Sequence, residues 1–231
     1  MRKYWWKILS ILLLAFAVIG GFLLPVPQLP IVHESIRNLY FHVPMWFTMV
    51  VLFVLSVVYS IKYLRTNDLK DDLYAMCYVS VGVVFSVLGM ITGMEWAYYT
   101  WPADSQQANF LWTGDPKQLC SALCMLIYMA YLVLRGSIAD FDKRAKISAV
   151  YNIFACALMF PLIFIIPRMV PSLHPGSDGT NPADPNHLDA TMRLVFWPAV
   201  LGWILLSVWI TTLLIRINLI AKKEILYSDV S

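Results

Sequence analysis

The sequence predicts an all-α fold: a polytopic integral membrane protein whose six transmembrane helices form one domain over residues 1–231. Three observations predict it. Of the 231 residues, 60% are hydrophobic and only 13% are charged. In soluble globular domains, about 45–50% of the residues are apolar and about 25% are charged. Six apolar runs are long enough, or nearly so, for the roughly 20 residues that a membrane crossing takes. Lys and Arg gather in alternate connections between these runs.

The six apolar runs give the predicted spans in chain order. The first follows the basic start "MRKYWWK" and is kept as a span, because "LLPVPQLP" follows it instead of a small-residue cleavage site. The second opens near Pro44, since proline fits the first turn of a helix. The fourth is short and begins as early as Pro116. The predicted spans are residues 5–24, 43–64, 73–96, 119–134, 149–166 and 194–217.

The basic residues predict the orientation. If the N-terminus is cytoplasmic, the cytoplasmic segments hold thirteen of the 17 Lys and Arg residues. The outside then holds four, namely Arg37, Lys117, Arg168 and Arg193. This asymmetry is the positive-inside pattern of membrane proteins. Both termini are therefore expected in the cytoplasm, and the outer loops are expected at about residues 25–42, 97–117 and 167–193.

The four cysteines all fall within predicted spans, which argues against disulfide chemistry in the outer loops. Cys120 and Cys124 are four residues apart and share a helix face. They fit either small apolar packing residues or a thiol redox pair. A disulfide exchanger needs cysteines at the aqueous edge, so packing is the favoured interpretation.

All four histidines lie on the predicted outer side, namely His33, His42, His174 and His187. Trp101 and Trp112 lie there too, with Trp96 at the edge. Taken singly, these residues fit an interfacial aromatic belt and solvated histidines. However, His42 opens the second span and His174 follows the fifth, so helices that end at one surface can bring the two imidazoles together.

This set of side chains matches the needs of haem. Haem iron takes an imidazole on each side, its flat macrocycle suits aromatic walls, and its two propionates suit Arg or Lys donors. Arg37 and Lys117 lie beside the residues already named. A hard metal ion would need more carboxylates. The sequence has no Gly-rich phosphate loop, so any use of ATP would require another subunit.

Several motifs resemble the haem-handling membrane proteins of cytochrome c biogenesis, closest to the CcmC type, with the CcsA type as a relative. "RNLYFHVP" resembles the R-x-x-Y-x-H-V-P element of that family, and "TGMEWA" resembles the segment before its tryptophan-rich loop. "LWTGDPKQLCSALCMLIYMAYLVLR" resembles the end of that loop, W-x-W-D-P-K, and the helix after it. "SLHPG" occupies the place of the second histidine, and "LDATMR" precedes the last span.

The resemblance implies a role for each matching residue. His42 and His174 would be the axial ligands of haem b iron, Arg37 matches the family's arginine, and Lys117 stands at the basic position of the tryptophan-rich motif. Trp112 and Asp115 match that motif as well. Gly114 stands where the family has Trp, so the aromatic wall is expected to come from Trp101, Tyr98, Tyr99 or Phe110.

The resemblance also implies a function. The chain would hold haem at the periplasmic face of the bacterial inner membrane and present it to the haem chaperone CcmE, beside CcmA, CcmB and CcmD, without being an enzyme. The alternative is a CcsA-like cytochrome c synthase subunit, which usually has more spans. A third possibility is a b-type cytochrome that passes electrons. It is disfavoured because histidines are expected outside the spans.

Overall fold

The structure is a computed structural model that describes residues 4–28, 32–101, 114–174 and 188–228, with side chains to residue 221. Over these residues it has six long helices: α1 (Trp5–Leu23), α2 (Leu39–Thr66), α3 (Leu69–Thr100), α4 (Pro116–Ser137), α5 (Phe141–Phe160) and α6 (Ala190–Ser228). A 3₁₀ helix, η1 (His33–Asn38), precedes α2, while a π-helical turn, η2 (Pro161–Ile165), and a 3₁₀ turn, η3 (Ile166–Arg168), continue α5.

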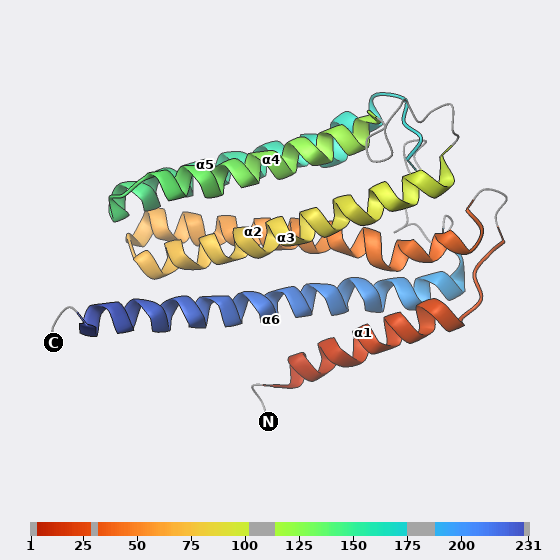
Figure 1. Cartoon of the computed structure of the whole chain (residues 1–231), viewed down its shortest axis with the longest axis horizontal. Coiled ribbons are helices and arrows are strands. Elements are labelled where there is room, and N and C mark those ends of the chain that lie inside the picture. The colour runs from red at the N-terminus through yellow and green to blue at the C-terminus, as the bar shows by residue number, and fades with distance from the viewer. Residues whose placement is uncertain (1–3, 29–31, 102–113, 175–187, 229–231) are drawn as a thin grey trace.

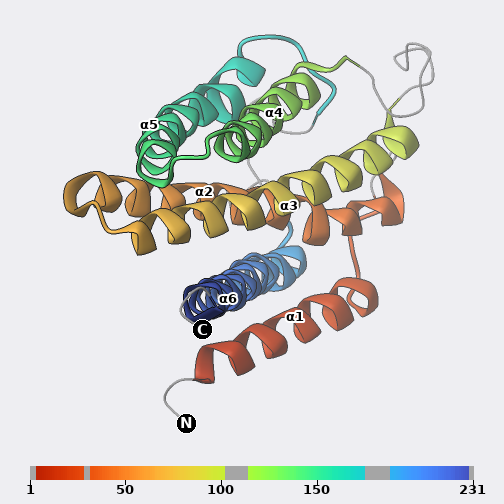
Figure 2. The same ribbon diagram turned by 60° about the vertical axis from the view of Figure 1, so that its left-hand side comes forward.

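Six segments built from these helices are long and apolar enough to cross a membrane, which confirms the predicted fold class. The helices stack in layers, and helices of neighbouring layers cross at an angle (Figures 1 and 2). The pair α2 and α3 forms the middle layer, α4 and α5 cover one side of it, and α6 covers the other. Helix α1 packs on α6 as the outermost element.

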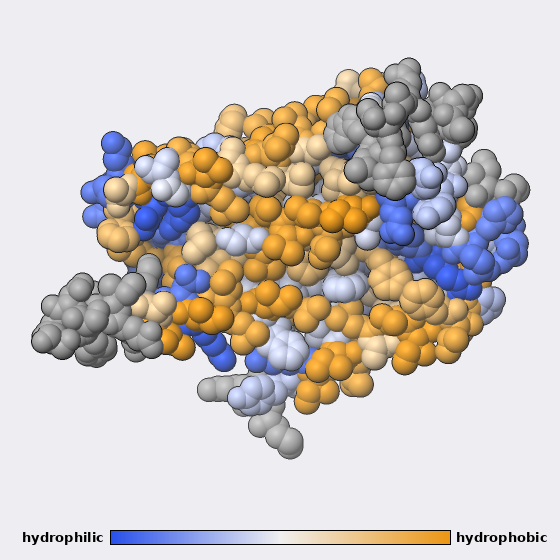
Figure 3. Space-filling view, in the orientation of Figure 1, coloured by the Kyte–Doolittle hydropathy of each residue, from blue (hydrophilic) through white to orange (hydrophobic). Residues whose placement is uncertain are grey.

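The polar residues gather at the two ends of the bundle, and an apolar belt surrounds its middle on the face shown in Figure 3. We call the end that carries His42 and His174 the histidine end. The opposite end, which carries Arg65, Lys70 and Lys143, is called the basic end. An apolar belt between two polar ends is the surface expected of a protein with a lipid-facing perimeter.

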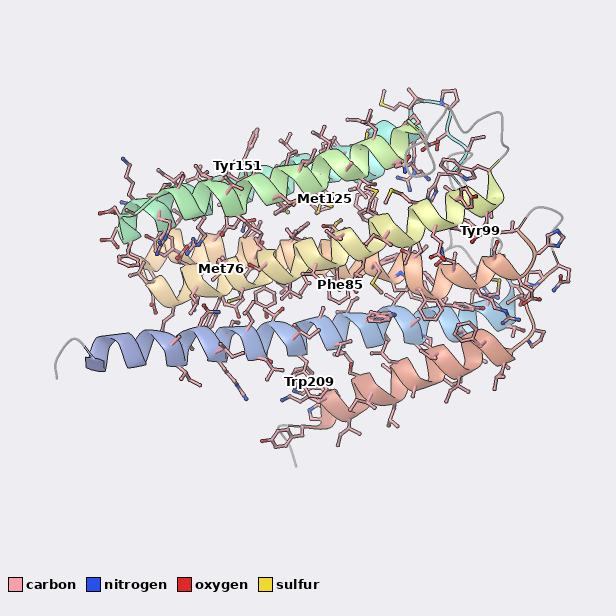
Figure 4. The ribbon with its side chains drawn as sticks, in the orientation of Figure 1. Met76, Phe85, Tyr99, Met125, Tyr151 and Trp209 are labelled. Atoms are coloured by element: carbon pink, nitrogen blue, oxygen red, sulfur yellow. The ribbon has the colours of Figure 1, made fainter. Side chains whose placement is uncertain are left out.

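Close packing between α2 and α3 positions the functional residues. Gly82 of α3 faces Phe53 of α2, where a Cβ atom would lie 2.5 Å from a ring carbon. Phe53 in turn stacks on Tyr128 of α4, with ring centroids 3.5 Å apart. Towards α6, Phe85 meets Trp203 edge to face at 6.3 Å (Figure 4). Small residues allow membrane helices to approach closely, so the middle layer is held by van der Waals packing.

Polar contacts also join the helices. A buried amide on α5, Asn152, bonds to Ser56 and Ser60 of α2, with its nitrogen 2.9 Å from each hydroxyl. Towards the basic end, Arg135 pairs with the buried Asp72 across α4 and α3. Hydrogen bonds of this kind fix the pairing of helices that lipid alone would not specify.

Helix boundaries differ from the prediction at the histidine end. Helix α2 begins at Leu39, so Pro44 lies inside the helix rather than in its first turn. The carbonyl of Tyr40 therefore lacks its usual helical donor, since proline has no N–H. The expectation that no span contains a histidine was wrong, because His42 lies within α2. Helix α3 also runs on to Thr100, beyond the end predicted at residue 96.

Candidate functional site

The structure brings His42 and His174 together at the histidine end. His42 is the fourth residue of α2 and is buried, with 5% of its surface exposed. His174 comes from the segment after η3. Their ring centroids lie 6.1 Å apart, and the ring planes make an angle of 44°. Two imidazoles from distant parts of the sequence thus face a common space.

A hydrogen bond to α3 fixes the orientation of the His42 ring. Its Nδ1 lies 3.1 Å from the hydroxyl oxygen of Thr92. That hydroxyl lies 2.8 Å from the carbonyl oxygen of Leu88, to which it donates its hydrogen. The Thr92 oxygen is therefore the acceptor and His42 Nδ1–H the donor. This tautomer leaves the lone pair on Nε2, the state in which that nitrogen can bind a metal.

Two glycines on α3 make room for the aromatic side chains of α2. A Cβ atom on Gly93 would lie 2.6 Å from Cε1 of His42, and one on Gly89 would lie 2.9 Å from the indole of Trp46. The glycines are four positions apart in the sequence, so they share one helix face, as in the small-xxx-small pattern of membrane helix pairs. The His42 ring can occupy its position only because residue 93 has no side chain.

Asp115 holds the segment that carries His174. Asp115 is the N-cap of α4, and its Oδ1 accepts a hydrogen bond from the backbone N–H of Lys117 at 2.9 Å. The same carboxylate accepts from Ser172 Oγ at 2.9 Å and from the N–H of Leu173 at 3.0 Å. The N–H of His174 then donates to Ser172 Oγ at 3.1 Å. One buried carboxylate thus caps a helix and anchors the histidine.

Lys117 contacts His174 directly. Its Nζ lies 3.3 Å from Nδ1 of the imidazole. Lys117 is the second residue of α4, so its ammonium group extends from the first turn of that helix towards the histidine.

A cavity of about 210 Å³ lies between the two histidines and the helices around them. Its lining is mainly apolar and aromatic, with Lys117 and Arg168 as its cations. The lining residues are His42, Val43, Trp46, Gly89, Met90, Gly93, Met94, Trp96, Ala97, Trp101, Lys117, Gln118, Ser121, Ile163, Phe164, Pro167, Arg168 and His174. Sites for small ligands are concave and apolar with a few polar groups, as this one is.

The spacing of the histidines fits one metal atom. Metal–imidazole bonds are about 2 Å long, so rings that bind one atom from opposite sides have centroids on the order of 6 Å apart. The described residues contain no group of three His, Cys, Asp or Glu side chains that could hold a bare metal ion. A metal that already has four ligands from a macrocycle needs only two more, and the cavity offers two.

The guanidinium group of Arg37 contacts the end of α1 and its own 3₁₀ helix η1. Its Nη1 donates to the carbonyl oxygens of Gly21 and Leu24 at 2.6 and 2.8 Å, and its Nε donates to Glu34 at 2.6 Å. Arg37 thereby caps the C-terminal end of α1, where the carbonyl groups favour a cation. The described residues that line the cavity do not include it.

The aromatic wall comes from α2 and α3. Trp46, Trp96 and Trp101 line the cavity, and Trp96 meets His174 edge to face at 6.4 Å. The exposed Tyr98 and Tyr99 do not belong to the described lining; Figure 4 shows Tyr99 near the end of α3. The expected residues Trp112 and Phe110 lie outside the described residues, as does His187.

Gly114 has a backbone conformation that explains its departure from the motif. Its φ is +72°, in the left-handed region that favours glycine. A Cβ there would meet no atom within 4 Å, so the cost of a larger residue lies in the backbone rather than in crowding. Gly114 turns the chain directly before the Asp115 cap.

Four residues of the site were missed from the sequence: Thr92, Gly93, Trp46 and Arg168. "TGMEWA" contains two of them, and the predicted third span includes both, but the sequence did not show which face of that helix meets α2. The spacing of Gly89 and Gly93 was the available signal, since it marks a helix face that another helix approaches closely. His33, which matches no motif of the family, is exposed and lies outside the described lining.

The comparisons with known proteins identify a family. The sequence model of the family described as "Heme exporter protein C" (CcmC) matches residues 2–228. The chain is 21% identical to "Heme exporter protein C" of Haemophilus influenzae over 196 residues, which cover 82% of this chain and 73% of that protein. It is 24% identical to the protein of the same name from Rhodobacter capsulatus over 134 residues, 56% and 52% of the two chains.

A second group of relatives matches a shorter part of the chain. "Cytochrome c biogenesis protein CcsA" of Prochlorococcus marinus is 30% identical over 101 residues, which cover 44% of this chain and 29% of that protein. The resemblance to the CcmC type, with the CcsA type as a relative, is confirmed.

Proposed function

The chain belongs to the haem exporter protein C family, and from this premise we propose that it binds haem b at the histidine end and passes it on for cytochrome c maturation. The cavity between His42 and His174 is the observation that carries the proposal. Haem is the cargo of this site. The role is transfer, so the chain binds and releases haem without turning it over.

His42 and His174 are the proposed axial ligands. The tautomer of His42 supports its role as a ligand, because the hydrogen bond to Thr92 leaves the Nε2 lone pair for iron. His174 is supported by its distance from His42 and by the anchoring of its segment to Asp115. Hydrogen-bond partners that hold a histidine in this way orient imidazole ligands in metal sites.

Lys117 and Arg168 are the proposed partners of the propionates. Both line the cavity, and both are cations at its edge. Charge-assisted hydrogen bonds to carboxylates are among the stronger contacts that a protein offers. Arg37, which the sequence suggested for this role, stays a third proposed partner, because its three described acceptors use only three of the five guanidinium N–H donors. Trp101 and Trp112 are proposed to contact the macrocycle.

The proposed setting is the bacterial inner membrane, with the histidine end facing the periplasm. The positive-inside pattern supports this orientation, and the name of the Haemophilus influenzae relative supports an exporter. The acceptor is then a periplasmic haem chaperone of the CcmE type, and CcmA, CcmB and CcmD are the proposed subunits beside this chain. A CcsA-like synthase is disfavoured because the match covers 29% of such a protein.

An absorption titration tests the proposed function. The purified protein in detergent is loaded with ferric haem, and its spectrum is recorded before and after the apo form of the chaperone is added. We expect a low-spin six-coordinate spectrum that decays as the chaperone takes up haem. A protein that binds no haem, or that keeps all of it in the presence of excess chaperone, would contradict the proposal.

A further inference from the structure

The contact between Lys117 and His174 determines where the imidazole carries its proton. A lysine ammonium group has three donors and no acceptor. At 3.3 Å from Lys117 Nζ, Nδ1 of His174 is therefore the acceptor, and it supplies its lone pair. A neutral imidazole has one N–H and one lone pair. Its proton then lies on Nε2, so Nε2 has no lone pair for a metal.

This contact and coordination of iron exclude each other at either ring nitrogen. If Nε2 binds iron, the ring proton lies on Nδ1 and points at the donor hydrogens of Lys117. If Nδ1 binds iron, the lone pair that Lys117 uses is taken. His174 can therefore become a ligand only when the Lys117 ammonium group has moved to another acceptor.

His42 has the opposite arrangement. Its Nδ1–H donates to Thr92, whose own hydrogen goes to the Leu88 carbonyl. That bond persists when Nε2 binds iron, and a donor bond at Nδ1 makes the imidazole a stronger ligand. The two proposed ligands thus differ: the partner of His42 supports coordination, whereas the partner of His174 competes with it.

A carboxylate is a more favourable acceptor for the Lys117 ammonium group than His174 is. It lies in the first turn of α4, where the partial positive charge of the helix N-terminus disfavours a cation. It also lines the cavity, where the carboxylates of a porphyrin would arrive. A carboxylate offers a charged acceptor in place of a neutral ring nitrogen.

We propose that Lys117 makes ligation by His174 depend on the carboxylates of the incoming porphyrin. On binding, the Lys117–His174 hydrogen bond breaks and a Lys117–carboxylate bond forms. The ring proton of His174 moves from Nε2 to Nδ1, and the Nε2–iron bond forms. When an acceptor protein draws the carboxylate away, Lys117 returns to His174 and the iron bond opens. The inference rests on the proposed function. It states what controls the bond between iron and one of the two proposed ligands, His174.

The experiment compares two porphyrins in two proteins. Ferric haem and its dimethyl ester, which lacks free carboxylates, are titrated into the parent and into Lys117→Met, and the low-spin fraction is read from the absorption spectrum. With haem, both proteins are expected to be low-spin. With the ester, the parent is expected to be mainly high-spin, and Lys117→Met is expected to raise the low-spin fraction at least threefold.

Controls separate this inference from simpler explanations. Lys143→Met removes a lysine at the basic end and should match the parent with both porphyrins. Lys117→Ala should repeat the result of Lys117→Met. If Lys117 only binds a propionate, the substitution weakens haem binding and leaves the ester spectrum unchanged, which would overturn the inference.

The two proposals fail differently. If haem is low-spin but the parent and Lys117→Met give identical spectra with the ester, control by Lys117 is contradicted. The proposed haem site is not affected by that result. The absence of a low-spin species with haem in every protein contradicts the haem site, and the control by Lys117 with it.

Discussion

Asp115 and Ser172 lie 2.9 Å apart, carboxylate oxygen to hydroxyl oxygen, and join the start of α4 to the segment that carries His174. Asp115→Ala removes this bond, the bond to Leu173 and the helix cap. Loss of an N-cap alone costs about 1 kcal/mol, and the two further bonds are lost beside a buried site. We expect a lower unfolding temperature and a shift of bound haem towards high spin, measured by thermal unfolding and absorption.

Asp140→Ala is the matched control. Asp140 caps α5 through the backbone N–H of Lys143 at 2.7 Å, at the basic end. Asp140→Ala therefore removes a comparable helix cap and leaves the segment that carries His174 unchanged. Equal haem spectra for the two variants would show that Asp115 does not position His174.

Gly93→Ala tests the space that α3 leaves for His42. Its Cβ would lie 2.6 Å from Cε1 of the imidazole, so the ring must move. We expect the variant to fold and to lose most of the low-spin signal of bound haem. Gly136→Ala, where a Cβ meets no atom within 4 Å, should keep the parent spectrum. A parent-like spectrum for Gly93→Ala would contradict the placement of His42.

Thr92→Val tests the hydrogen bond that selects the His42 tautomer. Valine keeps the shape of threonine and removes the acceptor for Nδ1–H. Removal of the hydrogen-bond partner of a histidine ligand weakens metal binding about 10–100-fold. We expect a loss of haem affinity in that range in an equilibrium titration, and Thr92→Ser should restore it. An unchanged affinity would mean that Thr92 has no role in ligation.

The predicted orientation has its own test. Reporter fusions after Arg65 and Lys143 should give cytoplasmic signals, and fusions near Asp104 and Asp178, which lie outside the described residues, should give periplasmic signals. The reason is the excess of Lys and Arg on one side of the membrane. A cytoplasmic signal at Asp104 would contradict the assignment of the histidine end to the periplasm.

The sequence predicted the six helices because apolar runs of span length report directly on burial in lipid. Motifs in the sequence also predicted the candidate site residues His42, His174, Asp115 and Lys117. It missed the reach of α3 to Thr100, because polar and aromatic residues at a helix end resemble an interfacial loop. Thr92 and Gly93 lay inside the predicted third span, but the apolar content of a span does not show which of its faces meets His42.

The position of Arg37 could not be read from the sequence either. In the sequence, an arginine that binds an anionic ligand looks the same as an arginine that caps the end of a helix. Only the geometry distinguishes them, because the carbonyl oxygens of Gly21 and Leu24 come from a helix that the sequence does not place beside Arg37.

The most direct test of the haem site is the absorption spectrum of His42→Ala and His174→Ala with bound haem. Each substitution removes one axial ligand and opens a coordination position on the iron. We predict weaker binding, a partly high-spin spectrum in each variant, and recovery of the low-spin spectrum with added imidazole. His33→Ala and His187→Ala should match the parent. Parent-like spectra in both His42→Ala and His174→Ala would contradict ligation by the two histidines.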